Sequence, residues 1–391
     1  MRTTVGIIGA GPAGLLLARL LHNAGIDSVV LESRDRAYVE QRQRAGILEQ
    51  GTVDVLREAG VGARMDREGM PHDGIELRFD RRRHRVDFPA LTGGKQVMVY
   101  AQTEVCKDLI AAQLADGGPL LFEAEALAVE GADTDAPRVR FRHEGREDVL
   151  DCAYVVGCDG FWGVARNAIP APESATYERT YPFGWLGILA DVAPSHDELV
   201  YARSDRGFAL LSMRSPSVTR AYLQVPEGTD AADWSDDAIW DELDRRLAVD
   251  DPAWRLARGP ITQKSVTPMR SYVHEPMRHG RLFLAGDAAH IVPPTGAKGL
   301  NLAVGDVVTF ARALVAATEK GDAALLDAYS QTCLRRVWQA ERFSYAMTTM
   351  LHRAPDATAF DDKIQLARLD RLTTSKAAEA DLAEAYTGFP L

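Results

Sequence analysis

Hydrophobic positions near the start of the chain follow the pattern of short strands separated by a helix. Thr3–Ile8 is an apolar, β-branched run that ends at glycines, Leu15–Leu21 has helical spacing, and Ser28–Glu32 is a second short apolar run. Together they predict one strand–helix–strand unit. The stretch 34–94 is rich in arginine and glycine, and its mixed pattern supports no assignment. Farther along, the pattern predicts strands at Gln96–Tyr100 and Asp151–Val156 and a helix at Thr103–Ala115.

The pattern changes between Tyr181 and Arg270, where short strands alternate with turn-forming residues. The stretches WLGILADV, ELVYARS, FALLSMRS and RAYLQVPEG predict an antiparallel sheet inserted as a second domain. A strand and a glycine turn return at RLFLAGDAAHIVPP, helical spacing follows at Gly299–Ala317, and the remaining residues indicate mostly helix. We therefore expect a mixed α/β fold in three segments, which are 1–180, the inserted sheet 181–270, and 271–391.

The composition limits the class of protein and its partners. A chain of 391 residues, 46% hydrophobic and 26% charged, is long enough for two domains or for one large fold with an insertion. Its apolar runs, such as Val307–Val315, are shorter than a membrane span, and Met1 leads directly into a strand, so we expect a cytoplasmic protein without a targeting signal. The formal charge of −11 disfavours nucleic acid and anionic membranes as partners. Reduced thiols and no bound metal are expected, because metal-site or disulfide spacing is missing from Cys106, Cys152, Cys158 and Cys333.

Glycines at the start of the first predicted helix form a nucleotide-binding motif. Gly9, Gly11 and Gly14 give the spacing GxGxxG between a strand and a helix, and Glu32 closes the second strand. The first glycine permits a tight turn, the second lets the backbone approach a pyrophosphate, and the third lets the helix pack on the strand. An acidic residue roughly 20 positions farther on accepts hydrogen bonds from a ribose. This context predicts a dinucleotide site, with an ordinary strand-to-helix turn as the alternative.

Two later glycine turns narrow the choice of dinucleotide. GCDG at Gly157–Gly160 and GDAAH at Gly286–His290 each place an aspartate in a turn after an apolar strand, although Asp and Gly are also common in ordinary turns. With GAGPAG, Glu32 and GDAAHIVPPTGAKGLNLA, they resemble the three fingerprints of the class A flavoprotein aromatic hydroxylases. RAGILEQG, YAQTEV, YPFGWLG and ERFSYAMT also resemble that family, over nearly the whole chain. The resemblance implies a Rossmann-like FAD-binding domain with an inserted antiparallel substrate-binding sheet and a helical C-terminal region.

The resemblance implies that FAD is bound and assigns residues to it. Arg44 and Gln102 would lie near the pyrophosphate and ribityl groups, and Asp287 on the ribityl chain. Arginine supplies a planar donor for phosphate, and a helix opening near Ala297–Asn301 presents backbone amides toward a reduced flavin. For Gln102 alone, a surface polar side chain is the alternative. The full set implied for FAD is Gly9, Gly11, Gly14, Glu32, Arg44, Gln102, Asp159, Asp287, Gly296, Leu300 and Asn301.

Four polar residues of the predicted sheet form a candidate carboxylate site. Ser212 and Arg214 are two apart on one strand, Arg220 and Tyr222 are two apart on the next, and SPSVT turns between them. Period-two alternation puts each pair on one face, and arginine can pair both oxygens of a carboxylate. From these residues alone, a solvated hairpin face is the alternative. The resemblance favours the site and assigns Ser212, Arg214 and Tyr222 to the carboxylate of 4-hydroxybenzoate and Arg220 to the region between substrate and flavin. Ala221, where the family carries a tyrosine, is expected to point away.

The resemblance also assigns a route for the phenolic proton. Hydroxylation next to a phenol oxygen needs the phenolate, but a phenol with a pKa near 10 is mostly protonated at neutral pH. Tyr201 would contact the substrate hydroxyl, Tyr386 would relay the proton, and His72 would exchange it with solvent. From sequence spacing alone, packed tyrosines and a surface histidine are the alternatives.

The segment PPTGAKG is assigned to the reacting end of the substrate. Its two prolines restrict the backbone and its two glycines leave it free to adopt unusual conformations, which suits a loop held against a ligand. The resemblance places the Pro294 carbonyl beside the substrate and gives Lys298 a part in a positive potential. That potential would offset the charges of a carboxylate, a phenolate and a reduced flavin.

The implied activity is that of an FAD monooxygenase acting on a small aromatic acid with O2. NADPH or NADH reduces the flavin, oxygen adds at flavin C4a as a hydroperoxide, and 4-hydroxybenzoate becomes 3,4-dihydroxybenzoate. Within the same fold, the alternatives are a hydroxylase of another aromatic acid and a 4-hydroxybenzoate enzyme that also takes 3,4-dihydroxybenzoate. From another class, the alternative is a non-catalytic flavin or nucleotide binder acting as a redox-responsive partner. The family also suggests a homodimer.

The electron donor has no motif of its own, because no second GxGxxG occurs. The resemblance therefore implies transient binding of the nicotinamide cofactor. Basic residues after Glu32 can attract a 2′-phosphate, but Asp35 and Glu40 oppose them, and Trp162 replaces a histidine expected near the cofactor's phosphates. We expect use of both NADH and NADPH. The implied contacts are Arg34, Tyr38, Arg42 and Arg270.

Overall fold

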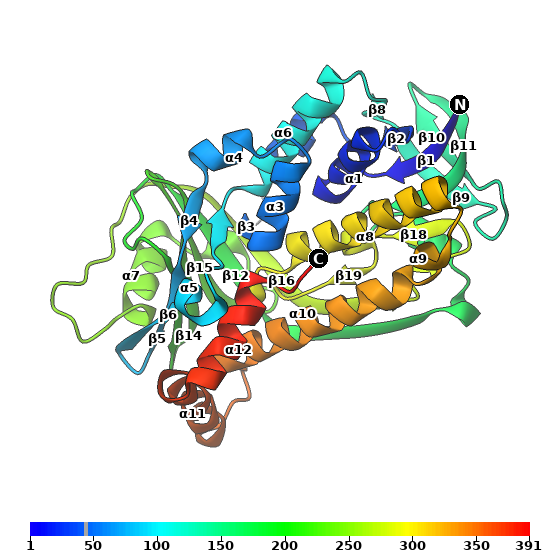
Figure 1. Cartoon of the computed structure of the whole chain (residues 1–391). Coiled ribbons are helices and arrows are strands. Elements are labelled where there is room, and N and C mark those ends of the chain that lie inside the picture. The colour runs from blue at the N-terminus through cyan, green and yellow to red at the C-terminus, as the bar shows by residue number, and fades with distance from the viewer. Residues whose placement is uncertain (43–45) are drawn as a thin grey trace.

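The computed structural model describes residues 1–42 and 46–391. One half of the protein is a sheet built around the N-terminal strand–helix–strand unit, and the other half is an antiparallel sheet (Figure 1). The long helix α10 (Tyr329–Leu351, orange) runs from the first half toward the second. The predicted mixed α/β fold, with an antiparallel sheet and a helical C-terminal region, is confirmed.

The first sheet has a parallel centre. Its strands are β1 (Arg2–Ile8), β2 (Ser28–Leu31), β8 (Leu120–Leu121), β9 (Glu125–Glu130), β10 (Arg138–His143), β11 (Arg146–Gly157), β17 (Arg278–His279) and β18 (Leu282–Leu284). β1 pairs in parallel with β2 and β11, and β11 pairs in parallel with β18. Such connections bring the carboxyl ends of these strands to one edge of the sheet, where α/β proteins bind nucleotides. The predicted strands Ser28–Glu32 and Asp151–Val156 therefore lie beside the N-terminal strand.

The second sheet is mostly antiparallel and carries the inserted segment. Its strands are β5 (Gly74–Phe79), β6 (Arg82–Asp87), β12 (Ala175–Ala190), β13 (Leu199–Ser204), β14 (Gly207–Ser215), β15 (Val218–Pro226), β16 (Ile261–Glu275) and β19 (His290–Ile291). The strand order is β19-β16-β12-β15-β14-β13-β5-β6. This sheet thus extends beyond 181–270, since it takes two strands from the stretch that supported no assignment.

The missed strands have a physical reason for their weak pattern. β6 reads RRHRVD and is mostly exposed at the sheet edge, so apolar alternation is not required there. β5 is buried along its whole length but contains Glu76 and Arg78. Arg78 Nε donates to Glu76 Oε1 at 2.6 Å, so the strand buries a charge pair instead of two apolar side chains.

A small third sheet and the helices complete the fold. The sheet contains β3 (Ile47–Glu49), β7 (Val97–Val99) and β4 (Met70–His72). The remaining helices are α1 (Pro12–Asn23), α2 (Arg36–Gln41), α3 (Gln50–Glu58), α4 (Ala63–Glu68), α5 (Phe88–Thr92), α6 (Gln102–Ala115), α7 (Asp236–Arg246), α8 (Gly299–Lys320), α9 (Ala324–Asp327), α11 (Ala359–Thr374) and α12 (Lys376–Thr387). The predicted helices at Thr103–Ala115 and Gly299–Ala317 correspond to α6 and α8.

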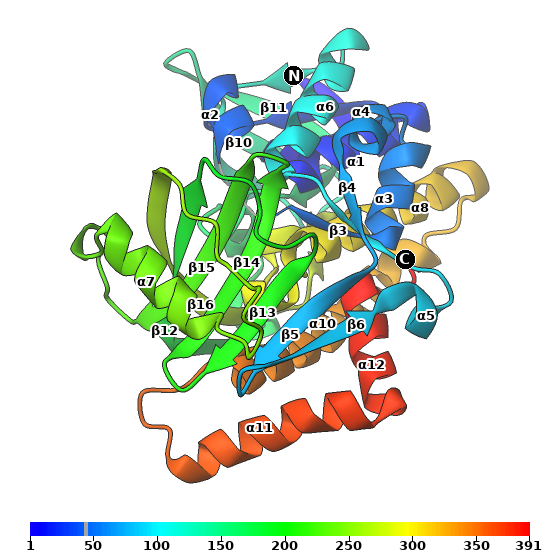
Figure 2. The same ribbon diagram turned by 90° about the vertical axis from the view of Figure 1, so that its left-hand side faces the viewer.

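Different helices cover the two faces of the antiparallel sheet, as Figure 2 shows for α7 and α12. Ala221 and Leu223 pack with Trp240 of α7 on one face. On the other face Tyr201 packs in a separate core with Tyr386 of α12. Ala221 therefore points away from the face that carries the candidate site, as predicted.

Helix α8 departs from the expectation drawn from the apolar runs. By length and composition alone it could cross a membrane, but 67% of its most apolar stretch is buried inside the protein. It packs against α1 and α10. The burial indicates a core helix, whose apolar residues face other parts of the same chain.

The buried His274 predicts a loss of stability in acid. Its side chain is buried on β16, and burial and the nearby Arg166 charge lower its pKa from 6.5 to about 4. Between these pH values the unfolded chain binds a proton that the native histidine does not, so stability falls as the pH falls from about 6.5 to about 4. We expect His274→Phe to flatten this part of the stability curve of the FAD-loaded protein, measured by urea unfolding. His143→Gln, on β10, is the control and is expected to follow the wild type; an unchanged slope in His274→Phe would contradict the prediction.

Candidate active site

The first glycine turn is shaped to admit a ligand. Gly9 has φ 101°, and a Cβ at Gly9 would lie 2.4 Å from the Cys158 carbonyl oxygen. A Cβ at Gly14 would lie 2.0 Å from the Gly9 oxygen, whereas one at Gly11 would meet nothing within 4 Å. The Ala10 N–H donates to Glu32 Oε2 at 2.8 Å, which fixes the carboxylate at the end of β2. The turn is thus closed on the protein side at two glycines and open at Gly11, which fits an approaching pyrophosphate.

These contacts predict different effects for two glycine substitutions. Gly11→Ala adds a methyl group where the protein has none nearby, and the Gly11 φ of −71° suits any residue. We expect it to weaken FAD binding at least about tenfold, because a single misplaced phosphate contact costs roughly 1.5 kcal/mol or more, while the thermal midpoint of the FAD-free protein stays unchanged. Gly14→Ala is the comparison, and it should lower both the affinity for FAD and the thermal midpoint of the FAD-free protein. Fluorescence titration of FAD and thermal unfolding measure the two effects, and unchanged FAD affinity in Gly11→Ala would contradict the prediction.

The second and third glycine turns present two aspartates in different ways. Asp159 accepts a hydrogen bond from the Ala165 N–H at 2.9 Å, and burial raises its pKa. Its other oxygen, Oδ1, is buried without a hydrogen-bond partner among the described residues. Asp287 is exposed in the turn at Gly286. Gln102 is half-buried at the first position of α6. The unsatisfied Asp159 oxygen fits a site that receives a hydrogen-bonding ligand.

Arg44, implied to bind the pyrophosphate, lies outside the described residues. Gly296 is buried in a short 3₁₀ turn that starts at Pro294, and Leu300 is half-buried in the first turn of α8. The Pro294 carbonyl accepts the Ala297 N–H at 3.0 Å within that turn. A Cβ at Gly299, the first residue of α8, would meet nothing within 4 Å, so this helix also begins beside open space. Its free N–H groups can stabilise negative charge there.

The side chains at the start of α8 are bound within the protein. Asn301 Oδ1 accepts from the Glu49 N–H at 2.9 Å, and its amide donates to the Ile47 and Ala297 carbonyls at 3.0 and 2.8 Å. Lys298 Nζ donates to Glu49 Oε1 at 2.6 Å and to the Tyr386 carbonyl at 3.0 Å. Asn301 can therefore reach FAD only through its backbone, and much of the Lys298 charge is offset by Glu49. Burial lowers the pKa of Lys298.

The four residues of the candidate carboxylate site lie on neighbouring strands. Ser212 is directly opposite Arg220 in the β14–β15 ladder. Arg220 Nε donates to the Tyr222 hydroxyl at 2.9 Å. Arg214 follows Ser212 at a point where the ladder shifts register. Burial and the Arg220 charge lower the pKa of Arg214 to about 10, so it stays charged at neutral pH. Two guanidinium groups and two hydroxyls thus gather at one end of this hairpin, a suitable site for a carboxylate.

Tyr201 and Tyr386 form a hydrogen-bonded pair in the core. Their hydroxyl oxygens are 2.7 Å apart, and both side chains are 1% exposed. Tyr201 lies in the cross-strand row that also contains Leu210 and Tyr222. Burial raises the pKa of both phenols, so both are protonated at neutral pH and can pass a proton by exchanging donor and acceptor roles.

His72, which the resemblance assigns to proton exchange with solvent, is buried. It is 3% exposed at the end of β4, and its Nδ1 has no hydrogen-bond partner among the described residues. Burial lowers its pKa. The next residue, Asp73, accepts the Phe88 N–H at 2.7 Å through its carbonyl, and the Phe88 ring stacks on Tyr386 at 5.0 Å. His72 is thus connected to the tyrosine pair through packing, and its role in a relay stays a prediction.

Comparison with known proteins identifies the family. A family described as an FAD binding domain matches residues 2–344. The chain belongs to the FAD binding domain family. The p-hydroxybenzoate hydroxylase of Acinetobacter baylyi is 50% identical over 100% of this chain and 96% of its own length. The dialkyldecalin synthase of Streptomyces rugosporus is 28% identical over 85% of this chain and 69% of its own.

Solved structures share the fold of this family member at lower identity. The p-nitrophenol 4-monooxygenase PnpA of Pseudomonas putida DLL-E4 superposes with a TM-score of 0.85, at 19% identity, over 100% of both chains. The OxyS anhydrotetracycline hydroxylase of Streptomyces rimosus gives 0.77 at 23% identity, over 99% of this chain and 76% of its own. At these identities the likeness establishes the fold alone.

The residues implied for the nicotinamide cofactor of this family member form two groups. Arg34 and Arg42 lie over the Tyr38 ring, 5.2 and 5.7 Å from its centre, at α2. Arg270 lies 4.7 Å from the centre of the Phe161 ring, next to Trp162, which is 86% exposed. Cationic and aromatic surface is present at both places.

Two buried acids that support the site escaped the sequence patterns. Asp306 of α8 accepts from the Gly286 N–H at 2.9 Å and from His290 Nε2 at 2.7 Å, so it holds the third glycine turn in shape. Glu49 pairs with Lys298. An acid among the mostly apolar residues of the first half of α8 was a detectable signal for Asp306, whereas Glu49 has no distinguishing neighbours in the sequence.

Proposed function

We propose that this chain, an FAD-dependent aromatic hydroxylase, converts 4-hydroxybenzoate to 3,4-dihydroxybenzoate with NAD(P)H and O2. One observation carries the proposal. The buried Tyr201–Tyr386 pair and the Arg214, Arg220 and Tyr222 cluster occupy the same face of the antiparallel sheet. A ligand with a carboxylate at one end and a phenol at the other matches these two groups.

The open glycine turn and the start of α8 fit FAD. Gly9, Gly11, Gly14 and Glu32 would hold its ADP half, and Asp159, Asp287 and the backbone at the start of α8 would hold the rest. When bound, FAD would supply the redox chemistry, with the nicotinamide as hydride donor and O2 as the source of the inserted oxygen. Everything else in the reaction is done by the side chains, which bind and orient the aromatic acid and control its proton.

Arg214 would pair the carboxylate, with the Ser212 and Tyr222 hydroxyls beside it. Arg220 already donates to the Tyr222 hydroxyl, which orients that hydroxyl toward the same end of the site. Tyr201 would accept the phenolic proton while its own proton moves to Tyr386. The phenolate is the electron-rich form that hydroxylation at the neighbouring carbon requires, so the tyrosine pair determines the rate at neutral pH.

The test is consumption of NADH and of NADPH by the FAD-loaded protein, with and without 4-hydroxybenzoate. Chromatography identifies the aromatic product. Strong stimulation together with 3,4-dihydroxybenzoate supports the proposal. Stimulation without hydroxylated product makes 4-hydroxybenzoate an effector only, and a panel of substituted benzoates then finds the substrate. No stimulation would contradict 4-hydroxybenzoate as the substrate, and the same panel would then be used to find the substrate.

We propose further that NADH and NADPH both serve, that the protein acts in the cytoplasm and that it forms a homodimer. For the donor, arginines and acids alternate around Tyr38, and Arg36 is paired with Glu40 at 2.6 Å. A 2′-phosphate would thus meet little net positive charge there. A large difference between the KM values for NADH and NADPH would contradict dual use.

A further inference from the structure

We propose that His352 is a positioning residue for the carboxylate site and acts on Tyr222 through Trp185. The proposal rests on the proposed function of Tyr222 as a carboxylate ligand. It concerns three aromatic side chains on the face of the antiparallel sheet that carries Tyr201: His352 from the end of α10, Trp185 from β12 and Tyr222 from β15. Trp185 contacts both of the others.

The contact between His352 and Trp185 fixes the tautomer of the histidine. Trp185 Nε1 donates to His352 Nε2 at 2.6 Å, because an indole nitrogen can only donate. His352 Nδ1 therefore carries the proton and donates to the Thr348 carbonyl at 3.0 Å. The imidazole is 2% exposed and neutral, since burial lowers its pKa to about 3. A neutral ring with one acceptor and one donor satisfies both partners.

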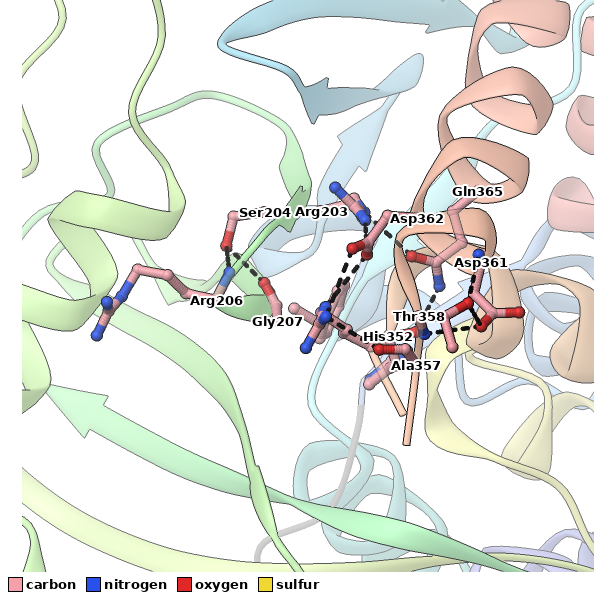
Figure 3. A network of polar contacts seen from close by, with 12 residues as sticks. Arg203, Ser204, Arg206, Gly207, His352, Ala357, Thr358, Asp361, Asp362 and Gln365 are labelled. Atoms are coloured by element: carbon pink, nitrogen blue, oxygen red, sulfur yellow. Dashed lines mark hydrogen bonds and ion pairs between the residues drawn. The ribbon is translucent and has the colours of Figure 1, made fainter. Parts of the chain in front are cut away.

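Aromatic packing holds the imidazole at one angle. Its ring stacks on Phe183 at 4.9 Å and on Phe208 at 4.3 Å. The main chain is held as well, because Gln365 Nε2 donates to the His352 carbonyl at 2.6 Å. Gln365 Oε1 in turn accepts from Arg203 Nε at 3.1 Å (Figure 3). Arg203 is two residues from Tyr201 on β13. Ring stacking and the hydrogen bond to the main chain thus both hold His352 Nε2, the acceptor for Trp185, in place.

Trp185 forms a side wall for Tyr222. The two ring centres are 4.8 Å apart. Gly187, directly opposite Tyr222 in the ladder, leaves room for that ring, since a Cβ there would lie 3.3 Å from Tyr222 Cε1. The tyrosine ring therefore leans along the strand onto the indole. Loss of the indole hydrogen bond would let Trp185 turn and would move the Tyr222 hydroxyl away from Arg220.

The chain offers a matched control for the indole hydrogen bond. Trp240 of α7 is also buried, and its Nε1 donates to the Gly259 carbonyl at 3.2 Å. It packs on the opposite face of the same sheet. Trp240→Phe removes a comparable hydrogen bond without touching Tyr222.

The experiment compares FAD-loaded wild type with His352→Asn, His352→Gln, Trp185→Phe and Trp240→Phe. A glutamine oxygen can occupy the position of Nε2, whereas asparagine reaches only the position of Nδ1. We expect His352→Asn and Trp185→Phe to raise the KM for 4-hydroxybenzoate about tenfold, as for loss of one buried hydrogen bond, with kcat nearly unchanged. His352→Gln and Trp240→Phe should stay close to the wild type. In a Tyr222→Phe background, His352→Asn should add little, since both changes act on one contact.

Two results would overturn the proposal. One is an unchanged KM in His352→Asn, and the other is an equal rise in KM with and without the Tyr222 hydroxyl. If the wild type itself does not convert 4-hydroxybenzoate, the proposed substrate fails separately. The NMR resonance of the Trp185 indole N–H is then the test. The resonance should shift in His352→Asn and stay in place in His352→Gln, and an unshifted resonance in His352→Asn would overturn the proposal.

Discussion

Tyr201→Phe is expected to lower product formation at neutral pH by about a hundredfold or more, as for loss of a general base, while 4-hydroxybenzoate still binds. The Tyr201 hydroxyl is buried and lies 2.7 Å from that of Tyr386, so its removal breaks the route at the first step. The ring remains, so the packing of the site is kept. Because a phenol has a pKa near 10, the defect should shrink as the pH rises toward that value.

The measurement is the ratio of 3,4-dihydroxybenzoate formed to NAD(P)H consumed, with substrate affinity from the flavin absorbance change. Tyr386→Phe should give a similar loss, because it breaks the next step. Tyr329→Phe is the matched control. Tyr329 is equally buried, but it lies in the core of the first sheet, where its hydroxyl donates to the Leu284 carbonyl at 2.8 Å. Unchanged product formation in Tyr201→Phe would remove the relay from the mechanism.

The nucleotide half of the fold was predictable because its determinants are local. The glycines 9, 11 and 14 follow one strand directly, and Gly14 packs on the backbone of Gly9 a few residues earlier, although Gly9 itself packs on the distant backbone of Cys158. Strand and helix periods in the same stretch agree with the motif. Ala221 was also placed correctly, since alternation along one strand decides which face a side chain occupies.

The substrate site was less accessible from the sequence because its contacts are long-range. Tyr201 and Tyr386 are 185 positions apart, and only folding of α12 against β13 brings them together. His72 was assigned to proton exchange with solvent, with an ordinary surface histidine as the alternative, and nothing in MPHDG indicates that it is buried. The partners of Lys298 and Asn301 were missed for the same reason, since Glu49 lies about 250 positions away.

Arg214→Gln is expected to raise the dissociation constant for 4-hydroxybenzoate by about a hundredfold or more, as when one member of a buried, hydrogen-bonded charge pair is lost. Arg214 is mostly buried beside Arg220, and burial together with that like charge lowers its pKa to about 10. A carboxylate bound beside these two guanidinium groups would be strongly stabilised. The two strands position both guanidinium groups before the ligand arrives, and glutamine would remove one of the two charges and leave only Arg220.

Arg214→Lys separates charge from geometry. A lysine keeps the charge but loses the planar pair of donors that matches two carboxylate oxygens, so its dissociation constant should lie between those of wild type and Arg214→Gln. Arg206→Gln is the control, since Arg206 lies in the turn between β13 and β14 and pairs with Glu242 of α7. Titration of the flavin absorbance gives all four constants. An Arg214→Gln dissociation constant close to that of the wild type would mean that the carboxylate is bound elsewhere, and the orientation of the substrate along this sheet face would have to be reversed.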